Sequence, residues 1–313
     1  MCTVTLIARR NGYILGMNRD EKLTRAPALL PAQHHLEGRV ALFPSEPTGG
    51  TWIGVNDAGA TLALINWYSA PARVQGEPVS RGQVVRLTLP CDSSKRVDEK
   101  LDKISLGKVN PFRLIGVFPY HQEITEWRWN LHRLERLRHR WRTNTWISSG
   151  FDESGAQETR RKTFADAIRQ NSAGSVDWLR RLHRSHGSEC GPYSHCMHRA
   201  DAATVSYTEV MVSRQTASMR YIAGAPCCQV PAPPSHLDLE ASRLDNHRDQ
   251  CGNQDISWAA TSDGQALHNR NKRQNRRRAL GWLDLGRVPC PITFREILPK
   301  RPFQTGKNVN AKP

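Results

Sequence analysis

The chain has little apolar material and no long apolar run. Hydrophobic residues make up 38% and aromatic residues 7% of the 313 residues, and the hydrophobic share is below that of a typical globular protein. No stretch approaches the roughly 18 consecutive apolar residues that a membrane span needs. The segment before Arg9 and Arg10 is too short for a signal peptide. We therefore expect no transmembrane segment and a cytoplasmic location.

The cysteine pattern favours neither disulfide bonds nor a metal site. Eight cysteines occur in a chain without a visible secretory signal, and thiols stay reduced in the cytosol. Cys190, His195, Cys196 and His198 are candidate metal ligands that lie close together. Their spacing matches no regular zinc finger, and two adjacent residues of a strand point to opposite faces. We predict packed or solvated side chains and no metal.

The charge of the chain is strongly positive. The formal net charge is +16, and such a chain attracts nucleic acid, anionic surfaces and acidic metabolites without specificity. Part of this charge lies in the run HNRNKRQNRRR at residues 268–278. No aromatic residues are interleaved there, so base stacking is not favoured. A solvated basic tail is the preferred interpretation, without a specific nucleic-acid partner, and nucleic-acid or anionic-surface binding through it is kept as an alternative.

The order of predicted elements indicates an α+β or layered α/β domain. Strands are expected in the first 70 residues, and helices and further strands follow. The expected helices span 80–89, 93–104, 157–170 and 176–183, and the last hairpin spans 204–223. A stiff Pro-Ala-Pro-Pro linker follows at 231–234, and the periodicity after it is weak. We predict one domain over residues 1–228 and a basic, weakly structured extension over 229–313.

The N-terminal residues predict a hairpin with a chemical consequence. Residues 2–8 are β-branched or apolar, and Asn11-Gly12 is a strong signal for a tight turn into a second strand. Antiparallel pairing then brings the two free ends together, which places Asp20 beside the amino terminus.

Cys2 is the candidate nucleophile of this arrangement. Removal of Met1 before a small residue would give residue 2 both a thiol and an α-amine. An α-amine with a pKa of about 7.7–8.0 is a usable base near neutral pH, so it can take the thiol proton and later protonate a leaving group. Arg19 and Asp20 are close enough along the hairpin to tune both groups.

Several motifs together resemble a known family. They begin with Met1-Cys2-Thr3 and include NRDE at 18–21, GGTWIGVNDAG at 49–59, Asn66, SSGFD at 148–152, CMHR at 196–199, TVS at 204–206 and GAPC at 224–227. This set resembles the NRDE family, which includes the transport and Golgi organisation protein 2 group. The resemblance covers residues 1–228 and leaves the tail unassigned.

The resemblance implies a fold and a set of roles. It implies the N-terminal-nucleophile (Ntn) hydrolase fold, a four-layer αββα sandwich, related to the cysteine branch that holds penicillin V acylase and bile salt hydrolase. Cys2 would attack an amide carbonyl, Asp20 would hold its α-amine, and Asn66 would help to form the oxyanion hole. No cofactor is implied.

The sequence departs from that branch at two positions. Met17 stands where the acylase branch has an arginine, so Arg19 is the candidate for the charge role. Ser149 falls where a second oxyanion asparagine is expected. With Asn18 and Arg199, Ser149 forms the predicted substrate-binding set, in which Arg199 would bind an anionic substrate group.

The predicted function is hydrolysis of a non-peptide C–N amide bond in a small acylated metabolite. The alternative on the same fold is a non-catalytic protein that binds or traffics lipid or haem, in which Cys2 would pack or ligate the haem iron. The second alternative is the binding of nucleic acid or an anionic surface through the tail.

Overall fold

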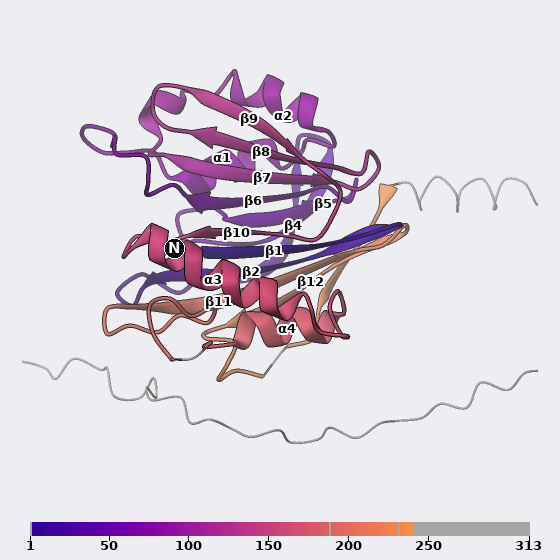
Figure 1. The fold of residues 1–313 in the computed structure, drawn as a ribbon. Helices are drawn as coiled ribbons and strands as arrows, with labels where there is room; N and C mark the ends of the chain where they lie inside the picture. The colour runs from indigo at the N-terminus through magenta and orange to yellow at the C-terminus, as the bar shows by residue number, and fades with distance from the viewer. Residues whose placement is uncertain (1, 188, 231, 241–313) are drawn as a thin grey trace, which may run out of the picture. The chain divides into compact units, whose positions relative to one another are not determined.

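The computed structural model describes residues 2–187, 189–230 and 232–240, and Figure 1 shows two antiparallel sheets stacked face to face. The first sheet contains, in spatial order, β10 (Asn144–Ser148), β1 (Cys2–Arg9), β2 (Gly12–Lys22), β11 (Ala202–Val212), β12 (Thr216–Ala223) and β13 (Ser235–Asp238). The second contains β3 (Leu29–Leu36), β4 (Arg39–Ser45), β5 (Ile53–Asn56), β6 (Thr61–Asn66), β7 (Phe112–Phe118), β8 (Glu123–Trp129) and β9 (Leu134–His139).

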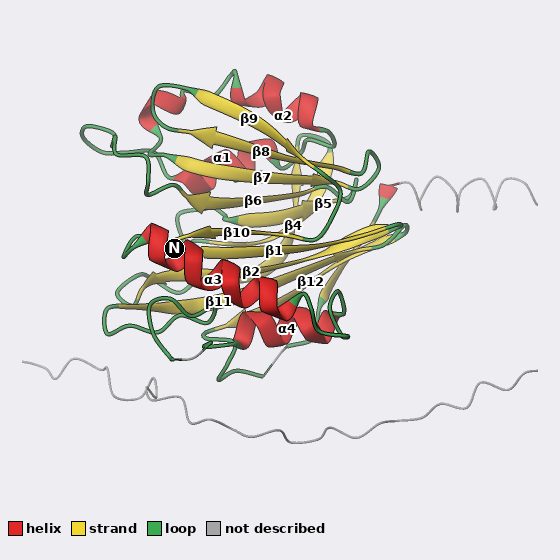
Figure 2. Cartoon of the chain, viewed as in Figure 1, coloured by secondary structure: helices red, strands yellow, loops and turns green. Residues whose placement is uncertain are grey.

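Helices cover the outer face of each sheet (Figure 2). On the second sheet these are α1 (Arg81–Thr88) and α2 (Ser94–Leu101), followed by the short 3₁₀ helix η1 (Leu106–Lys108). On the first sheet they are α3 (Glu153–Ala167) and α4 (Val176–Arg184). Three buried apolar clusters fill the spaces between successive layers. The predicted α+β fold, a four-layer αββα sandwich, is confirmed.

The central core lies between the two sheets because strand residues alternate between faces. Val4 and Leu6 of β1 point into it from the first sheet, and Ile53 and Val55 of β5 meet them from the second. All four are fully buried, and each such side chain contributes about 1.5–3 kcal/mol to folding through burial.

The predicted hairpin forms with the expected register. Gly12 ends the turn at a φ of 129°, and a Cβ there would lie 2.0 Å from the carbonyl oxygen of Val212. Only glycine fits this close approach of two strands. The pairing runs from Arg9 opposite Gly12 to Cys2 opposite Arg19.

Strands β3, β9 and β13 were not expected from the sequence. β3 and β9 are the two edges of the second sheet, and their residues are mostly exposed or half-buried. Polar edge strands lack the apolar alternation that identifies a strand in a sequence. β13 lies beyond the expected boundary at residue 228 and pairs with β12, and its Leu237 is buried in the central core. The basic run 268–278 lies outside the described residues.

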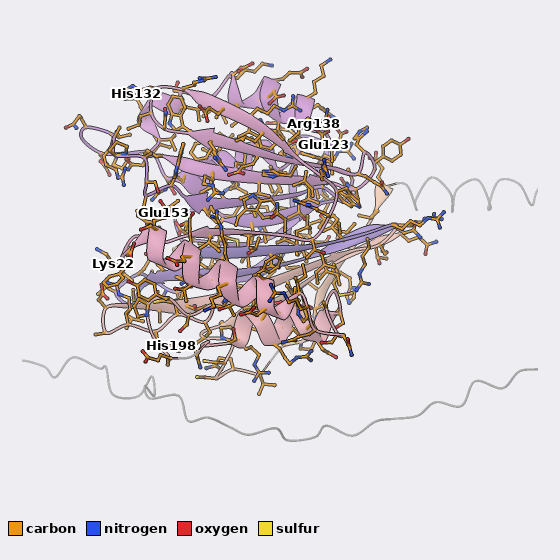
Figure 3. All side chains as sticks on the ribbon, in the orientation of Figure 1. Lys22, Glu123, His132, Arg138, Glu153 and His198 are labelled. Atoms are coloured by element: carbon orange, nitrogen blue, oxygen red, sulfur yellow. The ribbon has the colours of Figure 1, made fainter. Side chains whose placement is uncertain are left out.

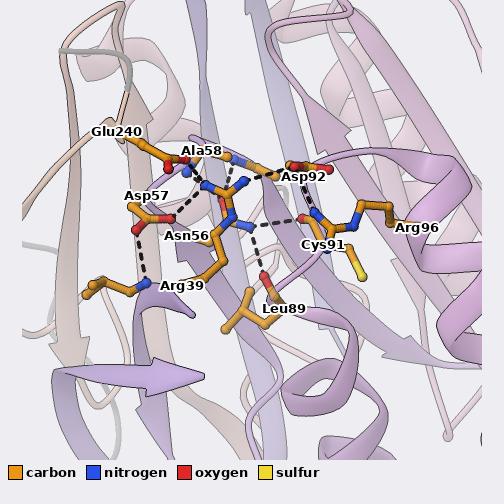
Figure 4. A network of polar contacts seen from close by, with 11 residues as sticks. Arg39, Asn56, Asp57, Ala58, Leu89, Cys91, Asp92, Arg96 and Glu240 are labelled. Atoms are coloured by element: carbon orange, nitrogen blue, oxygen red, sulfur yellow. Dashed lines mark hydrogen bonds and ion pairs between the residues drawn. The ribbon is translucent and has the colours of Figure 1, made fainter. Parts of the chain in front are cut away.

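A polar network ties the segment after β13 to the second sheet (Figure 4). The Arg39 guanidinium pairs with Asp57 at 3.3 Å, with Asp92 at 2.9 Å and with Glu240. Asn56 donates from Nδ2 to two backbone carbonyls between α1 and α2, each at 2.9 Å. The end of the described chain is therefore anchored to the turn that joins β5 and β6.

Within the described residues, the helices are too short or too polar to cross a membrane.

Candidate active site

Cys2 lies in a row of side chains that crosses the first sheet. It pairs with Ser148 of β10 on one side and with Arg19 of β2 on the other. Directly opposite residues of antiparallel strands project to the same face, and for this row that face is the one between the sheets. Cys2 is 7% exposed and Arg19 is 6% exposed. The Ser148 hydroxyl is buried and has no hydrogen-bond partner among the described residues.

Asp20 and Asn18 project to the opposite face, toward the helices. The Asp20 carboxylate accepts hydrogen bonds from Arg160 Nη1 at 3.2 Å and from Thr204 Oγ1 at 2.6 Å. Asn18 Nδ2 donates to the backbone carbonyls of His183 and His195 at 2.9 and 2.7 Å. The sheet therefore lies between the Cys2 thiol and the Asp20 carboxylate.

A β-bulge makes the Thr204 contact possible. The register between β11 and β2 shifts between Thr204, which pairs with Asp20, and Ser206, which pairs with Arg19. The extra residue keeps Thr204 on the helix side while Ser206 joins the row of Cys2 and Arg19.

Arg160 is a site residue that sequence reasoning missed. Its side chain is completely buried and also donates to Thr3 Oγ1 at 2.7 Å and to two backbone carbonyls of the segment before β11. Arg160 supplies a cation for Asp20 on the helix side of the sheet. Met17, at the position where the acylase branch has an arginine, is apolar and cannot do so. Arg161, the neighbour of Arg160, carries the same charge, and no sequence signal distinguishes the two.

Arg19 is held away from the carboxylate of Asp20. It pairs with Glu46 at 2.8 Å and lies over the Trp52 ring at 4.4 Å. The predicted charge network around Cys2 is therefore divided: Arg19 with Glu46 lies on the thiol side, and Arg160 with Asp20 lies on the helix side.

The surroundings of Cys2 keep its thiol protonated. Burial raises the pKa of the thiol, and the negative charge of Asp20 acts in the same direction. The Arg19 charge and a hydrogen bond with the Asp20 backbone lower the pKa but do not offset the burial. Because only the thiolate is strongly nucleophilic, Cys2 needs a nearby base to react near neutral pH.

Asn66 ends β6 in the facing sheet. Its Nδ2 donates to the Tyr68 hydroxyl at 2.8 Å, and the Tyr68 ring packs on Gly150, where a Cβ would lie 2.9 Å from ring atoms. Gly150 is two residues beyond Ser148, so this contact puts the Asn66 end of β6 toward the end of β1 at which Cys2 lies. The opposite end of β6 is fixed by Thr61, which accepts a hydrogen bond from the Tyr13 hydroxyl at 2.6 Å.

Arg81, at the start of α1, is a second residue that the sequence did not identify. Burial lowers the pKa of its guanidinium, while the nearby Tyr68 and Cys2 act in the opposite direction. It donates to the Pro111 carbonyl at 3.2 Å, and no carboxylate of the described residues forms a salt bridge with it. A partly buried cation thus lies within electrostatic reach of the thiol.

The remaining predicted residues lie in loops at the sheet end. Ser149 is 1% exposed, and its hydroxyl accepts from the Phe151 amide at 3.3 Å. Arg199 pairs with Asp201 at 2.8 Å and lies over the Phe151 ring at 4.7 Å. Ser148, one residue before the predicted Ser149, is the serine opposite Cys2.

Residues 1–125 match the Transport and Golgi organisation 2 family. The family resemblance predicted from the sequence motifs is confirmed by this match, which includes Cys2, the NRDE tetrapeptide and Asn66. No curated protein matches the chain.

Solved structures similar to the chain include two variants of conjugated bile acid hydrolase from Clostridium perfringens. They are 12% and 11% identical, with TM-scores of 0.49 and 0.47, and each comparison covers 78% of this chain and 94% of that chain. Penicillin V acylase from Agrobacterium tumefaciens is 9% identical with a TM-score of 0.44, covering 76% of this chain and 86% of that chain.

Proposed function

We propose that the protein is a hydrolase that cleaves a non-peptide C–N amide bond of a small acylated metabolite. Its nucleophile is Cys2, which becomes the first residue when Met1 is removed. The position of Cys2 carries this proposal. Cys2 is the first residue of a buried strand, and it pairs with Ser148 on one side and with Arg19 on the other. Asp20 comes directly after Arg19 in the sequence.

The proposed reaction has two steps. The α-amine of Cys2 takes the thiol proton, and the sulfur attacks the amide carbonyl carbon. The C–N bond breaks as the α-amine passes that proton to the departing nitrogen, which leaves an acyl thioester. Water then hydrolyses the thioester, releasing the acid and restoring the thiol. This route supplies the base that a thiol of raised pKa requires.

Other residues support the reaction in proposed roles. Asp20 orients the α-amine, and Arg160 and Thr204 are positioning residues because they hold both oxygens of its carboxylate. Asn66 and the unpartnered Ser148 hydroxyl are candidate donors to the oxyanion, and such a donor is typically worth about 10²–10³ in rate.

Arg81 indicates the class of substrate. Its guanidinium forms no salt bridge with a described carboxylate, although Cys2 and, more weakly, Glu21 act on it electrostatically, and a guanidinium binds carboxylates well. We therefore favour an acylated metabolite with a carboxylate. Arg81→Gln should raise KM for a carboxylate-bearing amide more than for its neutral counterpart. Ser149, Asn18 and Arg199 stay predictions as substrate-binding residues, and so does the cytoplasmic location.

The test starts with the mass of the purified, untagged chain. We expect loss of Met1 and labelling of Cys2 by iodoacetamide. With a panel of fluorogenic N-acyl amides, Cys2→Ala should lower kcat/KM by at least about 10³-fold, as expected when a nucleophile is removed. Cys91→Ala is the matched control, because Cys91 is also a buried thiol, at 3% exposure.

A second control separates the thiol from the amine. A form with an uncleaved N-terminal extension keeps the Cys2 sulfur but lacks its α-amine, and it should be as inactive as Cys2→Ala. Full activity in either form would refute the mechanism.

The second candidate function is binding or trafficking of lipid or haem without catalysis. The name of the matched family refers to transport and Golgi organisation, and the burial of Cys2 suits a packed side chain. Retention of Met1 and slow labelling of Cys2 would favour it, and binding of haem or of lipid vesicles by the full chain would then be the measurement to make.

A further inference from the structure

Four side chains of metal-ligating chemistry converge outside the candidate active site. His186 follows α4, Cys196 and His198 lie in the segment before β11, and Cys227 lies in the turn after β12. Their ligand atoms all lie within 4.8 Å of one another. Figure 3 shows His198 on the side that carries α3 and α4, away from Glu123 and Arg138 on the second sheet.

The set differs from the one considered in the sequence. Of the four candidates between residues 190 and 198, the structure brings together Cys196 and His198. His195 lies instead against His183, with 6.3 Å between ring centroids. The other two members, His186 and Cys227, lie in segments that no sequence pattern connects.

The distances from His198 Nε2 to the other three ligand atoms fit a tetrahedral ion. Zn–S bonds of about 2.3 Å and Zn–N bonds of about 2.0–2.1 Å at tetrahedral angles put two nitrogens about 3.3 Å apart and a nitrogen and a sulfur about 3.6 Å apart. The His186 and His198 Nε2 atoms are 3.3 Å apart, and His198 Nε2 is 3.6 Å from Cys196 Sγ and 3.3 Å from Cys227 Sγ.

Hydrogen bonding alone does not account for this cluster. Three heavy atoms surround His198 Nε2 at 3.3–3.6 Å. One imidazole nitrogen either donates or accepts a single hydrogen bond, so at most one of these contacts is satisfied by it. A central cation would accept lone pairs from all four ligands at once, and two thiolates would balance its charge.

We propose that His186, Cys196, His198 and Cys227 form a structural zinc site. A tetrahedral set of two sulfurs and two nitrogens is typical of Zn²⁺, and four protein ligands leave no open position for catalysis. The site joins three segments of the chain, two of which also meet through a backbone hydrogen bond from Cys196 to Ser185 at 3.0 Å.

The position of the site gives it a specific effect on Asp20. Met197 lies between two of the ligands, and its amide donates to Thr204 Oγ1 at 2.8 Å. Thr204 Oγ1 in turn donates to the Asp20 carboxylate at 2.6 Å. Binding of the ion would hold Met197 from both sides, and it would thereby hold Thr204, which orients Asp20. The zinc site does not depend on the proposed hydrolase activity.

The test is metal analysis of the full chain purified without a histidine tag. After dialysis against zinc and then against buffer, we expect about one zinc per chain in the wild type, and a small fraction of that in Cys196→Ser and Cys227→Ser. Cys228→Ser is the matched control, because it removes the adjacent exposed thiol, and it should keep the full zinc content.

Cobalt substitution keeps the proposal testable if the variants fold poorly. The wild type loaded with Co²⁺ should show the visible bands of a tetrahedral ion and a thiolate-to-cobalt band in the near ultraviolet. Removal of zinc by a chelator should lower the Tm, and added zinc should restore it. No retained metal in the wild type, a disulfide between Cys196 and Cys227, or equal zinc in the ligand variants would overturn the assignment.

Discussion

The buried His183 makes a prediction about acid stability that can be worked out quantitatively. Its side chain is fully buried, and a Cβ on Gly16 would lie 3.2 Å from its ring. Neither ring nitrogen has a hydrogen-bond partner among the described residues. Burial and then the Arg160 charge lower the pKa of His183 to about 3. The imidazole is therefore neutral in the folded protein.

The sign and size of the effect follow from proton linkage. In the unfolded chain the pKa of His183 returns to 6.5, so below that pH the unfolded state binds a proton that the folded state does not. Its contribution to stability is fully present above pH 6.5 and is lost as the pH falls toward the folded pKa. One pKa unit corresponds to about 1.4 kcal/mol, so the loss from pH 7 to about pH 5 is on the order of 2 kcal/mol.

The assay is urea unfolding of three proteins at about pH 7 and about pH 5. His183→Gln removes the titrating group. Between about pH 7 and about pH 5, the wild type should therefore lose on the order of 2 kcal/mol more of its free energy of unfolding than His183→Gln loses. His132→Gln, at an exposed position, should behave as the wild type. Other titrating groups contribute to all three proteins and cancel in the comparison. Equal pH dependence of His183→Gln and the wild type would refute the reasoning.

Three further substitutions test two buried ion pairs and the central core, each by denaturant unfolding. Arg160→Met removes one partner of a fully buried ion pair and should cost about 3–5 kcal/mol; a loss below about 1 kcal/mol would contradict it. Burial raises the pKa of Glu126, but its hydrogen bonds with His139 and Arg128 and the Arg113 cation hold that pKa far below its ordinary value. Glu126→Gln should therefore cost several kcal/mol above pH 5, with a smaller difference in acid. Leu6→Ala empties part of the central core and should cost about 2–5 kcal/mol; an unchanged midpoint would be inconsistent with the packing.

The sequence predicted what depends on local chemistry. Asn11-Gly12 set the hairpin register, which is why Cys2 and Asp20 were expected together. Strand alternation explains which side chains share a face with Cys2. Arg160 was not predictable, because its burial depends on how α3 lies on the first sheet, and Arg161 presents the same charge one position away.

Long-range convergence was also beyond the sequence. Cys227 reaches His186 only because β11 and β12 pair and return the chain to the end of α4. The window of residues 190–198 holds only two members of the cluster, Cys196 and His198, and the other two come from distant parts of the chain. The edge strands β3 and β9 were missed for the opposite reason, since their polar residues look like surface loops.

Cys2 and Asp20 lie on opposite faces of one sheet, so the residues around the thiol and the residues around the carboxylate can be substituted independently of each other. In the proposed mechanism, residues on the thiol side of the sheet would meet the substrate, while Arg160 and Thr204 hold the Asp20 carboxylate on the helix side. In the proposed mechanism, a change in α3 that moved Arg160 would therefore act on the α-amine through Asp20, from the side of the sheet opposite the thiol.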